Sequence, residues 1–112
     1  MRPGIDLNGY AEDIHENAVD KGWWDEPRAF GEVIALIHCE LSEAMEEYRD
    51  HHEPTEVYYR SDKPEGVPIE LADAFIRILD YCGAVGIDFE AAFRTKVAFN
   101  RTRPHKHGGK RI

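Results

Sequence analysis

The sequence predicts an all-α fold, a bundle of four helices. Four segments carry apolar residues at helical spacing, and no segment has a convincing strand pattern. The chain has 112 residues, the size of one small domain. A chain of this length buries a modest fraction of its surface, so a broadly apolar helix in it is expected to need a partner subunit.

The first two predicted helices cover residues 5–20 and 27–51. The first is only loosely periodic. Asp25, Glu26 and Pro27 form a start signal for the second, because acids and proline favour the first turn of a helix. Apolar residues of the second helix follow the 3.6-residue period and form one stripe. These residues are Phe30, Val33, Ile34, Ile37, Leu41, Ala44, Met45 and Tyr48.

The third predicted helix starts near Pro68, after a polar loop over residues 52–67, and is broken by Gly83 and Gly86. Apolar side chains cover well over half of its circumference, so it is expected to be buried on most sides. Its charged residues share one narrow strip. They are Glu70, Asp73, Arg77 and Asp80, and Arg77 is expected to pair with one of the two aspartates.

Asp88 is the expected N-cap of a fourth helix over residues 89–101. Residues 1–103 are therefore assigned to a single helical domain. Residues 104–112 are assigned to a basic, flexible tail, because proline and a glycine pair interrupt any regular pattern there.

Charge is distributed unevenly along the chain. The net charge is −8, but residues 101–112 hold five of the 14 basic residues and no acid. The remaining body carries all 22 acids against nine bases, so it is not expected to bind a nucleic-acid duplex. Only two cysteines are present, without metal or redox spacing, and neither a signal peptide nor a membrane-length apolar run is visible. A cytoplasmic location is expected.

Two pairs of acids stand out, Glu40-x-x-Glu43 and Glu70-x-x-Asp73. Residues three apart share a face of a helix, so each pair directs two carboxylates to nearly the same place. Four carboxylates between packed helices would repel one another strongly unless a cation joined them. Mg²⁺ is the cation that best suits an all-oxygen site, and Mn²⁺ is an alternative.

Other interpretations of these acids remain open. Exposed acids at this spacing are common, so a non-catalytic helical interaction module with a solvated acidic face is one alternative. A carboxylate-bridged redox-metal protein is another, but no histidine lies three residues after Glu40 or Glu70, as a di-iron site would require. The histidines and cysteines also lack the spacing of a zinc site.

In the order and spacing of its motifs, the chain resembles the MazG-like, all-α nucleoside triphosphate pyrophosphohydrolases. Glu40-Leu-Ser-Glu43 and Glu70-Leu-Ala-Asp73 match the ExxE…ExxD pattern of that family. Residues 96–103 look like its Lys-x-x-x-Asn-x-x-Arg segment, and residues 103–110 are similar to the endings of small members. The resemblance spans roughly residues 23–110.

The resemblance implies metal-dependent hydrolysis of a nucleoside triphosphate to the monophosphate and pyrophosphate. It implies that Glu40, Glu43, Glu70 and Asp73 are the metal-binding and catalytic residues, and that the protein forms homodimers or homotetramers. Lys96, Asn100 and Arg103 would hold phosphate or sugar oxygens, Lys110 could close over phosphates, and Trp24 could stack on the base. The family often has two adjacent glutamates in its first motif. Here Cys39 precedes Glu40, and Glu47 is a candidate for assisting a second metal ion.

Overall fold

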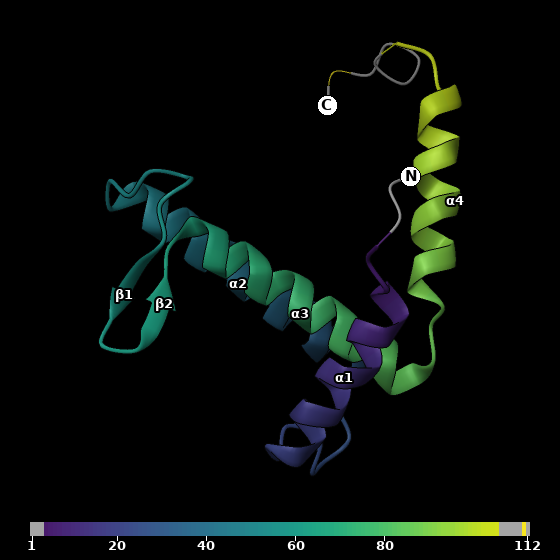
Figure 1. Ribbon diagram of the computed structural model, residues 1–112, viewed down its shortest axis with the longest axis horizontal. Coiled ribbons are helices and arrows are strands. Elements are labelled where there is room, and N and C mark those ends of the chain that lie inside the picture. The colour runs from purple at the N-terminus through teal and green to yellow at the C-terminus, as the bar shows by residue number, and fades with distance from the viewer. Residues whose placement is uncertain (1–3, 106–110, 112) are drawn as a thin grey trace.

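The computed structural model describes residues 4–105 and 111, and this part of the chain is mostly helical (Figure 1). Its helices are α1 (Leu7–Asp20), α2 (Phe30–Arg49), α3 (Val67–Val85) and α4 (Phe89–Thr102). A two-stranded hairpin, β1 (Tyr58–Arg60) and β2 (Lys63–Glu65), connects α2 to α3. The predicted helical fold is confirmed at this level.

The hairpin lies within residues 52–67, where the sequence predicts only a loop. Its strands have three residues each and pair antiparallel, with Tyr58 opposite Glu65 and Arg60 opposite Lys63. Ser61 in the connecting turn has a positive φ of 53°. Strands this short, one with a central proline, are too brief to give an alternating pattern. Tyr58 on β1 bonds Glu47 on α2, a contact that the local sequence does not reveal.

Capping aspartates explain where α1 and α4 begin. The Asp6 side chain accepts a hydrogen bond from the Gly9 amide, and Asp88 accepts one from the Ala91 amide. Asp88 is therefore the N-cap that the sequence predicts. It also accepts a bond of 2.8 Å from the Asn8 side chain, which ties the start of α4 to α1. The hydrogen bond from Asn8 lowers the pKa of Asp88 most, and the bond from the Ala91 amide lowers it further.

The predicted start of α2 is three residues early. The helix begins at Phe30, and Ala29 before it is extended, with φ −69° and ψ 146°. Arg28 donates to the Trp23 carbonyl at 2.8 Å and to Glu32 at 2.9 Å. These bonds hold the preceding segment as a loop folded onto the first turn of the helix.

α3 begins with Pro68 in its first turn, as the sequence predicts, but it continues past Gly83 and ends only at Val85. Gly86 then terminates it with a left-handed φ of 77°. Gly83 has a different role, because a Cβ there would lie 2.5 Å from the Ala11 carbonyl oxygen. The missing side chain lets α1 cross α3 at close range.

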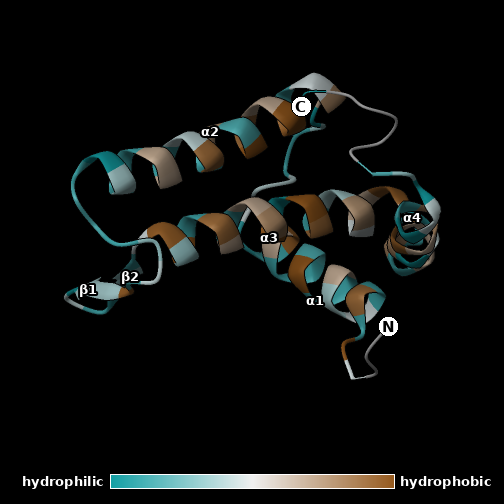
Figure 2. Cartoon of the chain, turned by 90° about the horizontal axis from the view of Figure 1, so that it is seen from above, coloured by the Kyte–Doolittle hydropathy of each residue, from teal (hydrophilic) through white to brown (hydrophobic). Residues whose placement is uncertain are grey.

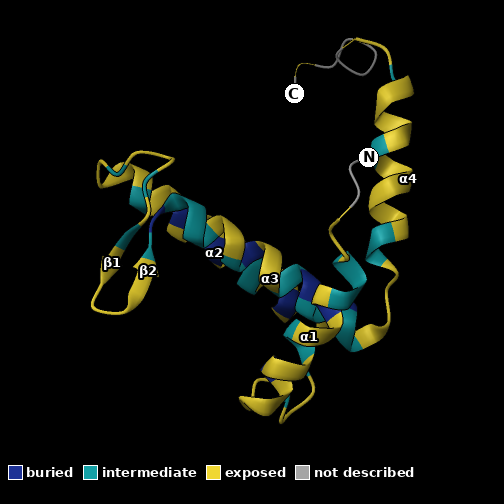
Figure 3. Cartoon of the chain, viewed as in Figure 1, coloured by how far each residue is buried: buried dark blue, intermediate teal, exposed yellow. Residues whose placement is uncertain are grey.

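α3 is the central helix of the chain. α2 runs beside it on one side, and α1 packs against it on the other (Figure 2). A small core lies where α1 crosses α3 and contains Ala11, Leu79 and Cys82. Most buried residues of the chain lie on α1, α2 and α3 (Figure 3). Burial raises the pKa of Cys82, and both cysteines are free.

α4 does not close the predicted four-helix bundle within the chain. It contacts α1 near its start and then projects away from the other helices (Figure 1). None of its residues is buried, and Phe93 and Phe99 are 42% and 52% exposed. The radius of gyration is 16.5 Å, against about 13 Å for a typical domain of this size. The described helices include none that could span a membrane.

Candidate metal centre

Three of the four predicted acids converge between α2 and α3. Glu40 and Glu43 on α2 and Glu70 on α3 each place a carboxylate oxygen within 4.8 Å of the other two. Glu40 is 9% exposed, Glu70 is half-buried and Glu43 faces solvent. The helical spacing supplies the pair on α2, and the side-by-side packing of α2 and α3 brings Glu70 to it.

Glu70 is the most perturbed acid of this group. Its Oε2 atom is buried and has no hydrogen-bond partner among the described residues. Burial raises its pKa to about 8, and contact with Glu43 adds to the shift. A buried carboxylate oxygen without a partner costs free energy, so a carboxylate held in this way favours a proton or a cation.

Asp73 lies beside the three acids, but none of its oxygens falls within the 4.8 Å group. Burial raises its pKa, and the charge of Glu40 adds to this effect while Arg77 opposes it. The expectation that Arg77 pairs with Asp73 or Asp80 is wrong. Its Nε donates to Glu40 Oε1 at 2.9 Å, because the packing of α2 on α3 places Glu40 opposite that part of the charged strip.

A cavity of about 290 Å³ adjoins the acids, at the lower end of the range for small-molecule sites. It lies between α1, the loop before α2, and the α2–α3 pair. Glu40, Asp73 and Arg77 line it on the side of the acids. The rest of its lining is Ile14, Asn17, Ala18, Trp23, Trp24, Arg28, Val33, Leu36, Ile76 and Asp80.

Trp24 has a fixed place in this lining. Its indole nitrogen donates to both carboxylate oxygens of Asp80 at 3.0 Å, and its ring meets that of His15 edge to face at 5.2 Å. His15 Nδ1 is 2.8 Å from Asp80 Oδ1. Asp80 thus joins α1, the tryptophan loop and α3, a role that sequence reasoning missed. Its place in the charged strip, seven residues after Asp73, was the available signal.

The predicted phosphate-binding residues, two on α4 and one directly after it, lie apart from the acids. Lys96, Asn100 and Arg103 are not in the cavity lining, and Lys96 and Arg103 instead lie over the ring of Phe99, at 4.9 and 5.5 Å from its centroid. Lys110, expected to close over phosphates, is outside the described residues.

Glu47 does not join the three acids. Its carboxylate accepts a hydrogen bond from the Tyr58 hydroxyl of the hairpin, which lies 2.8 Å from Oε2 and 3.0 Å from Oε1. A second cation at Glu47 would have to displace this bond.

Comparisons with protein-family models, curated proteins and solved structures find no match to this chain.

The arrangement suits a hard divalent cation. Its donors are carboxylate oxygens, which Mg²⁺ and Mn²⁺ prefer, and the group has one exposed member through which a ligand could enter. One oxygen of Glu70, Oε2, is buried and has no hydrogen-bond partner among the described residues, so this carboxylate can still accept a bond. These features fit the metal that the motifs imply.

Proposed function

We propose that the chain is a Mg²⁺-dependent hydrolase that splits a nucleoside triphosphate into the monophosphate and pyrophosphate. The observation that carries the proposal is the convergence of Glu40, Glu43 and Glu70, with one buried oxygen of Glu70 that has no hydrogen-bond partner in the described part of the chain. The motif resemblance supplies the reaction type. The two free cysteines agree with a cytoplasmic setting, which is part of the proposal.

In the proposal, Glu40, Glu43 and Glu70 hold the metal, and Asp73 adds negative charge beside them. Bound Mg²⁺ would neutralise triphosphate oxygens and make a bound water a better nucleophile. The raised pKa of Glu70 means that this carboxyl tends to keep its proton in the metal-free chain, so metal binding is expected to release a proton from it. Arg77 holds Glu40 in place through its bond to Oε1.

The cavity beside the acids is the proposed substrate site. Phosphates beside the three acids would place the base in the part lined by Trp23 and Trp24, which offer aromatic surface for stacking. Arg28 and Arg77 contribute positive charge to the same lining. In-line attack on phosphorus needs positioning and charge stabilisation, so no covalent nucleophile is required.

The test of this function is a nucleotide panel assayed with Mg²⁺. We expect pyrophosphate and the nucleoside monophosphate as products, and loss of turnover when EDTA removes the metal. Simultaneous measurement of orthophosphate separates the possibilities, because orthophosphate alone would identify a phosphatase. No turnover of any nucleotide, together with no effect of Mg²⁺ on melting, would favour the alternative of a non-catalytic interaction module.

We further propose that the protein acts as a homo-oligomer. Phe75, Phe89 and Phe93 form an aromatic row from α3 to α4, with ring centroids 6.3 and 6.4 Å apart. Phe75 and Phe93 are more than 40% exposed, as is Leu71 on α3. Exposed apolar surface of this kind is typical of subunit contacts. A role for Lys96, Asn100 and Arg103 in binding phosphate would then depend on how two copies meet, since these residues lie outside the cavity of their own chain.

Phe93→Asp tests the aromatic row. Because Phe93 is 42% exposed in the single chain, the substitution should weaken self-association while leaving the helices intact. Sedimentation velocity and circular dichroism are the measurements, and Tyr10→Asp on α1, at 58% exposure, is the control. Unchanged sedimentation of the Phe93 variant would show that this row is not a subunit contact.

A further inference from the structure

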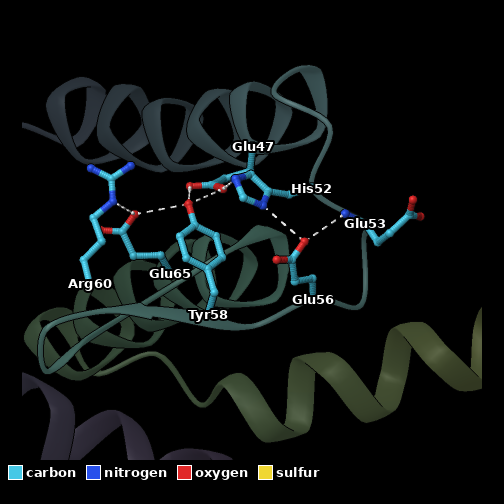
Figure 4. A network of polar contacts seen from close by, with 7 residues as sticks. All are labelled: Glu47, His52, Glu53, Glu56, Tyr58, Arg60 and Glu65. Atoms are coloured by element: carbon cyan, nitrogen blue, oxygen red, sulfur yellow. Dashed lines mark hydrogen bonds and ion pairs between the residues drawn. The ribbon is translucent and has the colours of Figure 1, made fainter.

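A cluster of side chains joins the β-hairpin to the C-terminal half of α2 (Figure 4). We call it the hairpin latch, and it consists of Glu47, His52, Glu56 and Tyr58. The Tyr58 hydroxyl is 2.8 Å from Glu47 Oε2, 3.0 Å from Oε1 and 3.5 Å from Glu65 Oε2. One hydroxyl donates one proton, so the short distances identify Glu47 as its acceptor.

The His52 ring fills the other side of the latch. It stacks on Tyr58 with ring centroids 4.4 Å apart and planes at 12°. Its Nδ1 is 3.1 Å from Glu56 Oε1, and its Nε2 is 3.6 Å from Glu47 Oε2. Glu56 Oε1 also accepts from the Glu53 amide at 3.3 Å. The loop after α2 is thereby tied to both the helix and the hairpin.

The segment that leads into the hairpin packs closely against Gly66, the N-cap residue of α3. Gly66 is buried, has a φ of 124°, and lies so close to Glu56 that an added Cβ would overlap the Glu56 carbonyl oxygen. The Gly66 carbonyl then accepts a hydrogen bond of 3.1 Å from the Glu70 amide. The position of the backbone that carries Glu70 therefore depends on its contact with Glu56. Glu56 is in turn connected to α2 through His52, which contacts both Glu56 and Glu47.

These contacts connect the two sides of the candidate metal centre. Glu47 lies one turn after Glu43 on α2, and Gly66, the N-cap residue of α3, lies one turn before Glu70. We propose that the hairpin latch is a positioning device that sets the separation of Glu43 and Glu70 and so the affinity for a divalent cation. Tyr58 is the positioning residue. The inference rests on the proposed metal-dependent function.

Tyr58 is a suitable residue to carry this role. Its hydrogen bond to Glu47, with burial and the charges of Glu47 and Glu65 adding to it, raises its pKa to about 12. The hydroxyl therefore stays protonated, and continues to donate, throughout the pH range in which the protein would be assayed.

Tyr58→Phe is the decisive variant, because it removes the hydroxyl and keeps the stacked ring. Tyr59→Phe is the matched control, since Tyr59 is the next residue of the same strand and is 66% exposed. Mg²⁺ titration of the full chain by calorimetry, without nucleotide, measures affinity directly. We expect Tyr58→Phe to raise the Kd by about tenfold, the lower end of the range for groups that orient metal ligands. Tyr59→Phe should match the wild type.

The direction of the change separates positioning from simple electrostatics. Freeing Glu47 from its hydrogen bond leaves the negative charge near the site unchanged or more available, so a purely electrostatic role predicts equal or tighter Mg²⁺ binding. Positioning predicts weaker binding. Amide hydrogen exchange should also accelerate at Ile69 and Glu70, whose amides bond the Gly66 carbonyl, and remain unchanged in the second half of α3.

His52→Gln is a second variant that loses the ring stacking on Tyr58, and it should weaken Mg²⁺ binding in the same direction. Normal binding by the wild type with unchanged or tighter binding by both variants would overturn the positioning role alone. Absence of Mg²⁺ binding by the wild type would overturn the metal centre and this inference together.

Discussion

Glu70→Gln is expected to abolish Mg²⁺ binding and nucleotide hydrolysis while making the metal-free protein more stable. The carboxyl of Glu70 lies against Glu43, and its buried Oε2 atom has no hydrogen-bond partner within residues 4–105 and 111. Glutamine has nearly the same shape, carries no charge, and can donate its amide hydrogens to Glu43. Relief of an unsatisfied buried polar group contributes about 1–3 kcal/mol. Thermal melting with and without Mg²⁺, beside the product assay, measures both effects.

The stability gain should depend on pH. Because the pKa of Glu70 in the folded chain is raised to about 8 from its ordinary value of 4.5, folding favours the protonated form. The wild type should therefore lose stability as the pH rises from about 5 to 8, whereas the variant should lose less. The difference in melting temperature should be smallest near pH 5 and largest above pH 8.

Glu16→Gln is the control for the change in net charge, because Glu16 is an exposed acid on α1. It should bind Mg²⁺ normally. In the wild type, Mg²⁺ at a hundred times its Kd would add about 2.7 kcal/mol of stability by mass action, and Glu70→Gln should show none of this. Retained hydrolysis with reduced metal-free stability would refute the assignment of Glu70 as a metal ligand. Glu40 is less suitable for this test, because it already bonds Arg77.

Gly83→Ala is expected to destabilise the fold although alanine is the better helix former. The new Cβ would lie 2.5 Å from the Ala11 carbonyl oxygen and 2.8 Å from His15 Cβ, so α1 must move away from α3. Overpacking of this kind costs about 1–3 kcal/mol. At about 4–8 °C per kcal/mol for a small domain, the fall in melting temperature should be readily measured. Movement of His15 should also disturb its contact with Asp80 at the cavity.

Gly31→Ala is expected to stabilise the same chain, the opposite of the effect expected for Gly83→Ala. Gly31 lies in the first turn of α2, and nothing would lie within 4 Å of an added Cβ. The substitution should stabilise the protein by up to about 1 kcal/mol through helix propensity. If both glycine variants were stabilised equally, the close crossing of α1 over α3 would be wrong.

Side-chain periodicity was sufficient to locate the helices and the acid pairs of this chain. Glu40 and Glu43 share a face because they are three residues apart on one helix, and this holds whatever the helix packs against. Asp88 and Pro68 mark helix starts for equally local reasons, since an N-cap and a first-turn proline act on the backbone next to them.

Contacts between segments that are distant in the chain could not be predicted from the spacing of residues along one helix. Gly83 reads locally as a helix breaker, yet its lack of a Cβ serves the approach of α1, more than 60 residues away in the chain. Likewise, Arg77 has acids on its own helix, but the packing of α2 gives it Glu40 as its partner.

The sequence by itself determined that this chain is helical and that two acid pairs lie on its helix faces, because both follow from spacing along one segment. The tertiary structure alone decided which three acids meet, which of their oxygens is buried, and how the hairpin is held against α2. The physical reason is that burial, pKa and ion pairing depend on distances between segments, and those distances are set by packing.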